Sequence, residues 1–422
     1  MITWIYRFVL FMLLFGMSAL IYGGNSLHPL LDKAVSGTTL IGILALIVCY
    51  FWQPPLYKTV AWLLGLGVIG LVLESKYEYG QFVYSYFVIK RFAYCGLALL
   101  AYVVATQAGP LKIKYAVYLI FAFYVINQLF LGQIFSYNLT SESRTVTSNE
   151  ALYLVIPCLY YLLMYLKDRK VPDLLLTLFS FALIVFLLHR SVISAAIVAI
   201  GVVAGLSMVG KLSTSGFPVG RTLGTFVILL ILLAPALAMM PGNKVDAFLE
   251  NIGGILDPKE DNTGSWRLEQ SEYYLSQIPD KPLLGWRYEG YDRGEIMVNE
   301  DFPEKGTIIH SQYIDMLYNY GAVGLAINLL IILGTLLIMY RRNKTFTTEQ
   351  TVLFGFLISG LVYGVSYQLP VFFWGFVGLA MYYALKRPDE EYPDDEYITV
   401  DITESSDTSL RPFVSTKTQQ VL

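Results

Sequence analysis

Hydrophobic residues fall along the chain in blocks about as long as a membrane span, separated by short polar stretches. Twelve blocks can be placed, at residues 2–22, 38–53, 58–74, 92–107, 115–135, 150–166, 174–188, 191–209, 222–241, 313–340, 350–367 and 371–385. A transmembrane helix needs roughly 17–25 mostly apolar residues, and a helix satisfies its own backbone hydrogen bonds in lipid. The pattern therefore predicts an all-α polytopic membrane protein with about 12 transmembrane helices.

Two long polar segments interrupt or follow these blocks. Residues 242–309 hold fourteen acidic and seven basic residues, together with Trp266 and Trp286, so we expect a partly helical cap loop rather than a linker. Residues 386–422 are acidic, rich in Ser and Thr and poor in apolar residues, which predicts a disordered tail. The expected organisation is helices 1–9 in 1–241, the loop in 242–309, helices 10–12 in 310–385 and the tail in 386–422.

The positions of Lys and Arg predict the orientation of these helices. With a cytoplasmic N-terminus, fourteen Lys and Arg residues lie in inside segments and six in the short outside loops. Cytoplasmic loops carry an excess of these residues in membrane proteins. Both termini are therefore expected in the cytoplasm and the 242–309 loop outside, with the first block kept as a helix rather than cleaved as a signal peptide.

Composition excludes several classes of function. Only 14% of the 422 residues are charged against 56% hydrophobic, too little charge for a soluble surface. The net charge of −3 provides no general basic surface, so nucleic acid is not an expected partner. The three cysteines form no CxxC pair, and His28, His189 and His310 are far apart in sequence, so neither a metal site nor a cofactor is expected.

Three cationic or titratable residues stand out on chemical grounds. Arg190 lies between two apolar blocks, where it is either an interfacial arginine or an anion clamp. His310 ends the long loop and opens the tenth block; the helix dipole there favours neutral imidazole and attracts anions, although a structural role is the alternative. Arg267 lies in the loop, where a solvated arginine is the simpler interpretation.

The order of several motifs resembles the O-antigen ligase and O-antigen polymerase superfamily of bacterial glycan-assembly enzymes. The matching features are Thr147–Pro157 at the start of the sixth helix, Arg190-Ser191, Arg267 beside an aromatic residue, Pro282-Leu283-Leu284-Gly285, His310-Ser311, and Gly321 with Gly324. The resemblance spans about residues 145–340. Two departures are Trp286-Arg287, where the family often has a second glycine, and Ser311, where Asn is common.

The resemblance implies a metal-independent, inverting glycosyltransferase whose donor is a glycan on undecaprenyl diphosphate. By position, Arg190 and Arg267 would bind the diphosphate leaving group, and His310 would accept a proton from the acceptor hydroxyl. Arg287, Asn149 and Ser311 are the further expected substrate-binding residues. The implied location is the bacterial inner membrane, in contact with membrane lipid and with a chain-length regulator as a further partner.

Three functions are compatible with these features. A repeat-unit polymerase is favoured because the 242–309 loop is net acidic, whereas an enzyme approaching phosphorylated lipid A-core would gain from positive charge. An O-antigen ligase, which passes finished polymer to lipid A-core, is the first alternative. The second is a transporter or flippase of lipid-linked sugars, which should place charged residues deep in several helices and often has two related halves.

Overall fold

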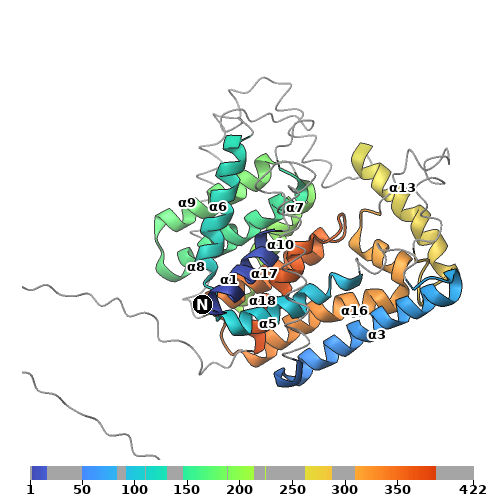
Figure 1. The fold of residues 1–422 in the computed structure, drawn as a ribbon. Coiled ribbons are helices and arrows are strands. Elements are labelled where there is room, and N and C mark those ends of the chain that lie inside the picture. Colours follow the sequence, from blue (N-terminus) through green and yellow to red (C-terminus); the bar gives the residue numbers. More distant parts are fainter. Residues whose placement is uncertain are drawn as a thin grey trace, which may run out of the picture. The chain divides into compact units, whose positions relative to one another are not determined.

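The computed structural model describes a chain of helices. The described residues are 2–16, 50–82, 92–109, 111–130, 146–187, 189–212, 224, 262–287 and 309–385. The helices (Figure 1) are α1 (Ile2–Phe11), α3 (Pro55–Tyr79), α5 (Gly96–Ala108), α6 (Ile113–Phe130), α7 (Ser148–Ala151), α8 (Val155–Asp168), α9 (Val171–Phe186), α10 (Arg190–Met208), α13 (Asn262–Gln277), α16 (Gln312–Arg342), α17 (Thr348–Tyr363) and α18 (Val371–Leu385). No β-strand occurs within these ranges, so the predicted all-α class is confirmed for this part of the chain.

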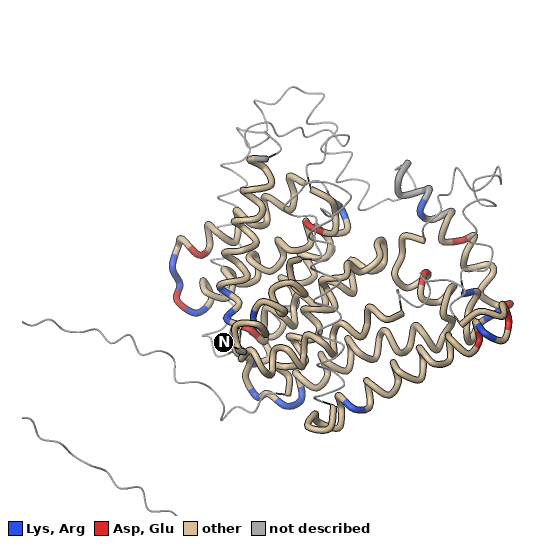
Figure 2. The backbone as a smooth tube through the Cα atoms, in the orientation of Figure 1, with Lys and Arg blue, Asp and Glu red and all other residues tan. Residues whose placement is uncertain are grey.

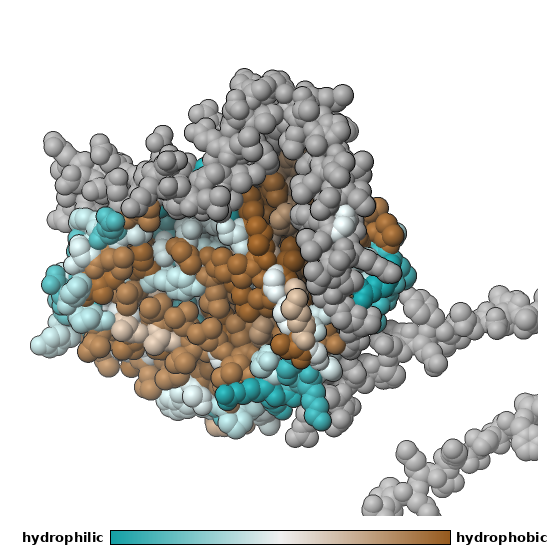
Figure 3. Space-filling view, turned by 180° about the vertical axis from the view of Figure 1, so that it is seen from behind, coloured by the Kyte–Doolittle hydropathy of each residue, from teal (hydrophilic) through white to brown (hydrophobic). Residues whose placement is uncertain are grey.

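Four of the helical segments are long and apolar enough to cross a membrane. They are Pro55–Tyr79, Ser148–Asp168, Arg190–Met208 and Gln312–Arg342, and α5 and α6, which meet at 117°, make a fifth if the bent pair counts as one span. Apolar side chains such as Trp62, Leu66 and Leu330 are exposed on these helices. Figure 3 shows one face that is mostly hydrophobic, as expected of a surface that faces lipid.

The interior is built around α18, which packs against α5, α16 and α17. Nearly all of α18 is buried, and glycine lets its backbone approach its neighbours. A Cβ atom on Gly378 would lie 2.1 Å from the carbonyl oxygen of Ala98, and one on Gly375 would lie 2.9 Å from that of Leu13. Small residues at helix contacts are the usual means of close packing between membrane helices.

Charged residues of the described part lie near the ends of the helices (Figure 2). Lys211, just after α10, donates hydrogen bonds to the carbonyl oxygens of Tyr340 (2.9 Å) and Asn343 (2.7 Å) at the end of α16. This lysine satisfies carbonyl groups that the helix itself leaves open and complements the negative end of its dipole. Among the described residues, the centres of the four membrane-length helices carry no charged side chain, which fits a chain that lies in lipid and argues against the intramembrane charges expected of a transporter.

Ten predicted blocks coincide with described helices, although several helices are shorter than their blocks. The block at 222–241 and most of the block at 38–53 lie outside the described residues, as do the tail at 386–422 and all but 262–287 and Ile309 of the 242–309 loop. Twelve spans, the cap and the orientation of the termini therefore stay predictions. Within the loop, Asn262–Gln277 is helical.

Candidate active site

Two of the predicted residues lie where α7 and the start of α10 meet. Arg190 is the first residue of α10, and the residue before it, His189, places its Nε2 atom 2.7 Å from the carbonyl oxygen of Val146. Val146 shortly precedes α7, which contains Asn149, and α10 packs against α7. Arg190 and Asn149 therefore lie at the same end of the helices.

The end of α17 reaches this region through Tyr363. Its hydroxyl donates a hydrogen bond to Oδ1 of Asn149 at 2.7 Å and lies 2.9 Å from Oγ of Ser148. Tyr363 stacks on Tyr367, one turn later in the chain, with ring centres 5.1 Å apart and an angle of 13° between the rings. Two aromatic rings thus lead from Asn149 toward the turn between α17 and α18.

Arg267, on α13, binds the second of these tyrosines. Its Nη2 donates a hydrogen bond to the Tyr367 hydroxyl at 2.8 Å, and the guanidinium carbon lies 4.4 Å from the centre of the Tyr367 ring. Contact with an aromatic ring stabilises a cation without neutralising it. Tyr367 therefore holds Arg267 in place while leaving its positive charge available.

His310 approaches the same tyrosine from the start of α16. Its ring centre is 6.3 Å from that of Tyr367, in an edge-to-face arrangement. Oε1 of Gln270, on α13, lies 3.2 Å from the His310 backbone nitrogen and 3.3 Å from Nδ1. Tyr367 is thus in contact with both Arg267 and His310, two residues that are 43 positions apart in the sequence.

The start of α16 is fixed to the turn between α17 and α18. Ser311 precedes the helix and is buried, and its Oγ donates to the carbonyl oxygen of Gly364 at 3.4 Å. The backbone N–H of Gln312 donates to the same carbonyl at 2.9 Å, and its side-chain Oε1 accepts from the Leu369 N–H at 2.9 Å. These contacts give Ser311 a role in placing the neighbouring His310; its predicted part in binding substrate stays a prediction.

A break in α16 lies about three helical turns after His310. Gly321 has φ 64° and ψ −169°, a conformation essentially restricted to glycine, and it splits the helix into two parts. Residues 282–287, termed the clip, pack into this break. A Cβ atom on Gly321 would lie 2.2 Å from the carbonyl oxygen of Leu283, and one on Gly285 would lie 2.6 Å from the Gly321 nitrogen.

The clip supplies the hydrogen bonds that the break removes. Amides of Trp286 and Arg287 donate to the carbonyls of Tyr318 (2.7 Å) and Asn319 (3.1 Å), and amides of Ala322 and Val323 donate to the carbonyls of Pro282 (2.8 Å) and Leu283 (3.2 Å). An interrupted membrane helix is tolerated where neighbouring groups satisfy its freed backbone. This arrangement explains why the Pro282–Gly285 motif and Gly321 occur in one chain.

Gly321→Ala should lower the stability of the protein markedly. The new Cβ would collide with clip backbone, and the Gly-only backbone conformation adds about 1–3 kcal/mol of strain. We expect a clearly lower Tm in detergent, measured by intrinsic fluorescence on heating. Gly334→Ala is the matched control, since a Cβ there meets nothing within 4 Å and Tm should stay unchanged or rise slightly. Equal Tm values for the two variants would contradict the structural role of the clip.

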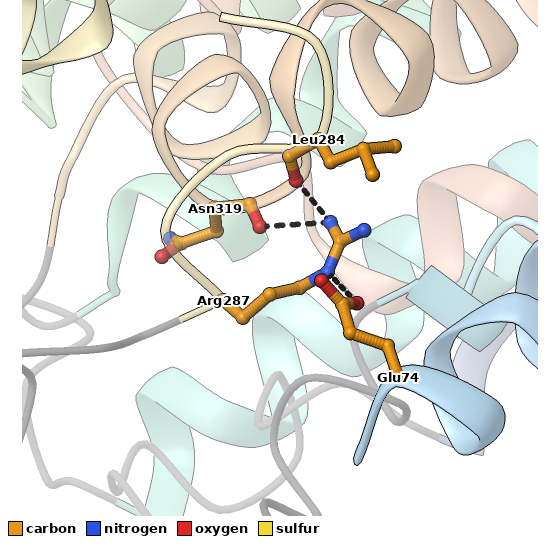
Figure 4. A network of polar contacts seen from close by, with 4 residues as sticks. All are labelled: Glu74, Leu284, Arg287 and Asn319. Atoms are coloured by element: carbon orange, nitrogen blue, oxygen red, sulfur yellow. Dashed lines mark hydrogen bonds and ion pairs between the residues drawn. The ribbon is translucent and has the colours of Figure 1, made fainter. Parts of the chain in front are cut away.

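Arg287 closes the clip rather than joining the residues around Tyr367 (Figure 4). Its Nε lies 2.5 Å from Oε2 of Glu74 on α3, and its Nη1 donates to the carbonyl oxygens of Leu284 and of Asn319, the latter at 3.2 Å. The residue has a positive φ of 52°, unusual for a residue with a side chain. These contacts tie α3 to the clip and to α16, and they occupy much of the guanidinium that was predicted to bind substrate.

Comparison with known protein families finds a match over the middle part of the chain. Residues 175–329 match the family described as O-antigen ligase. Over this segment the chain is similar to O-antigen ligases. The match confirms the resemblance to the O-antigen ligase and polymerase superfamily over this segment, and with it a multi-pass membrane protein of the general glycosyltransferase type. No curated protein matches the chain.

The matched segment contains most of the residues predicted for the site. Arg190, Arg267, Arg287, His310 and Ser311 lie within residues 175–329, as does the break in α16. Three residues around the site lie outside the matched segment: Asn149 before it, and Tyr363 and Tyr367 after it. Helices α7 and α17 therefore complete a site whose cationic residues all come from the matched segment.

Arg267 keeps hydrogen-bond donors open in this segment. The Tyr367 hydroxyl is its hydrogen-bond partner, and its Nε is buried without an acceptor. No carboxylate among the described residues forms an ion pair with it. A buried N–H without an acceptor is costly unless a ligand completes it, so this half-buried arginine suits an anionic ligand. The described ranges contain no group of three or more His, Cys, Asp or Glu side chains that could hold a metal ion.

Three residues of this arrangement were not predicted from the sequence. Tyr363 and Tyr367 belong to a chain with 32 tyrosines, many of them explained by the aromatic belts of membrane proteins. Their spacing of four at the end of an apolar helix, which places them on one face, was the available signal. Gln270 follows Arg267 by three residues, so once Asn262–Gln277 is known to be a helix, the two share a face.

Proposed function

We propose that the protein transfers a glycan from undecaprenyl diphosphate to an acceptor sugar hydroxyl on the outer face of the bacterial inner membrane, as a repeat-unit polymerase. The observation that carries this proposal is the meeting of Arg267 and His310 at Tyr367. A cation with open donors and a candidate proton acceptor lie beside one another at one end of a membrane helix bundle. The family match supports the general class of enzyme.

In the proposed reaction Arg267 and Arg190 bind the diphosphate of the donor. The acceptor oxygen forms a bond to the anomeric carbon from the face opposite the leaving group, and the bond from that carbon to the diphosphate oxygen breaks. Negative charge then grows on the diphosphate, where guanidinium groups stabilise it by paired hydrogen bonds. The anomeric configuration is inverted, and undecaprenyl diphosphate leaves. This chemistry needs no metal ion, because the arginines carry the positive charge.

His310 serves as the general base in this proposal. Its imidazole accepts the proton of the attacking hydroxyl as the new bond forms, which typically accelerates a reaction by about 10²–10⁴-fold. The position just before α16 favours the neutral, proton-accepting form because the helix dipole is positive there. Asn149 is half-buried at the same end of the bundle and is placed to contact a sugar, with its Oδ1 oriented by Tyr363.

A ligase that passes polymer to lipid A-core is the alternative, and it would use the same residues with a different acceptor. The acidic character of the 242–309 loop favours the polymerase, since lipid A-core carries phosphate groups.

The surface glycan of a strain lacking this gene, resolved on a gel, tests the assignment. A polymerase defect leaves single repeat units on core or carrier, and the wild-type gene restores the ladder. Polymer that accumulates without attachment to core would assign the protein as the ligase, and an unchanged glycan would overturn both.

A further inference from the structure

Gln270 occupies a position beside His310 that the proposed reaction does not yet explain. It is buried, with 2% of its surface exposed, and lies on α13 three residues after Arg267. Residues three apart share one face of a helix. The helix therefore presents Arg267 to Tyr367 and Gln270 to His310, so that one rigid element contacts the residues on both sides of the site.

The contacts of Gln270 determine which way its amide points. A backbone N–H can only donate, so the atom 3.2 Å from the His310 backbone nitrogen must be the amide oxygen, Oε1. The same oxygen lies 3.3 Å from Nδ1 of the His310 ring. Two lone pairs facing each other would repel, so Nδ1 carries a proton and donates it to Oε1. A neutral imidazole protonated at Nδ1 has its lone pair on Nε2.

We propose that Gln270 is a positioning residue that holds His310 in the Nδ1–H form and fixes its ring, so that Nε2 is the atom that accepts the proton of the acceptor hydroxyl. The inference deepens the proposed function and rests on it for the role of His310 as the base. Gln270 itself touches neither substrate nor the reacting atoms. It acts through the histidine, as the groups that orient a catalytic imidazole do in other enzymes.

An amide suits this position better than a carboxylate. A carboxylate would also accept the Nδ1 proton, but its negative charge would stabilise the imidazolium and so keep the base protonated to higher pH. It would also add a negative charge one turn from Arg267, where the proposed ligand is a diphosphate. Glutamine fixes the tautomer without either effect.

Enzyme kinetics in lipid nanodiscs give the first test, with an undecaprenyl-diphosphate-linked glycan as donor. Gln270→Leu removes the acceptor, and we expect kcat to fall about 10-fold or more while KM for the donor changes less than about 3-fold, since part of the imidazole adopts the wrong tautomer. Gln270→Glu keeps the acceptor, so kcat at high pH should stay within a few-fold of wild type. The acidic limb of the kcat–pH profile of this variant should move up by roughly one pH unit, because the carboxylate favours the protonated His310 ring.

A matched control lies on the same helix. Gln277 lies about two turns beyond Gln270 and accepts a hydrogen bond from the Tyr318 hydroxyl at 3.2 Å. Gln277→Glu preserves an acceptor for that hydroxyl, and it should leave kcat and the pH profile unchanged. A shift of the profile equal to that of Gln270→Glu would show a general effect of charge on α13 and would overturn the proposal.

Nitrogen NMR of histidine-labelled protein gives a readout that does not depend on activity. The spectrum of His310→Gln identifies the His310 signals among the three histidines of the chain. We expect the neutral ring of wild type to be protonated at Nδ1, and Gln270→Leu to show a mixture of tautomers. A wild-type ring protonated at Nε2, or the same tautomer in both proteins, would overturn the inference. The wild-type spectrum provides this test even if Gln270→Leu is inactive because it does not fold.

The two proposals fail in different ways. If His310→Ala is fully active while the tautomer still depends on Gln270, the role of His310 in catalysis is wrong and the contact between the two residues stands. If His310→Ala is inactive and Gln270 affects neither the tautomer nor the pH profile, the proposed function stands and Gln270 has no positioning role.

Discussion

Replacing His310 with alanine should lower kcat by about 10²–10⁴-fold, with little change in the KM for the lipid-linked donor. The side chain is proposed to act on the acceptor hydroxyl, so its loss removes an interaction made as the bond forms rather than one that holds the diphosphate. The acidic limb of the kcat–pH profile should disappear as well, because the base whose protonation would stop the reaction is gone. Product formation in nanodiscs, followed from about pH 5 to 9, measures both effects.

Two further measurements make the His310→Ala result specific. The variant should bind undecaprenyl diphosphate with the wild-type Kd, and its Tm should lie close to that of wild type because the histidine is only half-buried. In cells, the variant protein should reach the membrane without restoring the glycan of a deletion strain. A wild-type amount of product, with the acidic limb still present, would refute the assignment of the base.

Arg267→Ala should have the second large effect, of about 10²–10³-fold in kcat/KM. The guanidinium is proposed to stabilise charge on the leaving diphosphate, and removing one such donor from a site of this kind costs about 2.7–4 kcal/mol in the transition state. Arg267→Lys should recover only part of the loss, because an ammonium group keeps the charge but cannot provide the paired donors. Steady-state kinetics with varied donor, together with Kd for undecaprenyl diphosphate, separate the two contributions.

Arg342→Ala is the matched control for charge. Arg342 is exposed at the opposite end of α16 from the start that carries His310, so its removal changes the net charge equally without touching the site. We expect kcat/KM within about two-fold of wild type, as for most surface changes. If Arg267→Ala and Arg342→Ala lose activity equally, the diphosphate does not bind at Arg267.

The hydrophobic pattern predicted the helices well because lipid imposes length and apolarity on each span. The block at 150–166 corresponds to Ser148–Asp168, and the block at 313–340 to Gln312–Arg342, with errors of about two residues at each end. The break at Gly321 could not be predicted in this way, since apolar residues lie on both sides of it. What creates it is the clip, some 35 residues earlier in the chain, and hydropathy contains no information about such a pairing.

For the site, chemistry and motif order identified the residues that carry charge, and the fold was needed for those that hold them. Arg267 and His310 stood out because their side chains suit anion binding and proton transfer, and because they fit the order of the motifs. Tyr367 and Gln270 are common residue types without a charge, and only the folded chain brings them to the arginine and histidine. Arg287 was selected for its charge, and the structure pairs it with Glu74, so its part in binding substrate stays a prediction.

The break in α16 divides one helix into two stretches with different physical requirements. Ahead of Gly321 the helix buries three polar residues: Gln312 bonds to the turn between α17 and α18, and Asn319 donates to Asp315. From Ala322 to Arg342 it measures about 31 Å, the thickness of the hydrocarbon layer, and needs little more than apolar side chains of suitable size. Relatives should therefore diverge abruptly after Gly324, and a chimera that exchanges only the later stretch for another apolar helix should keep the activity of its parent.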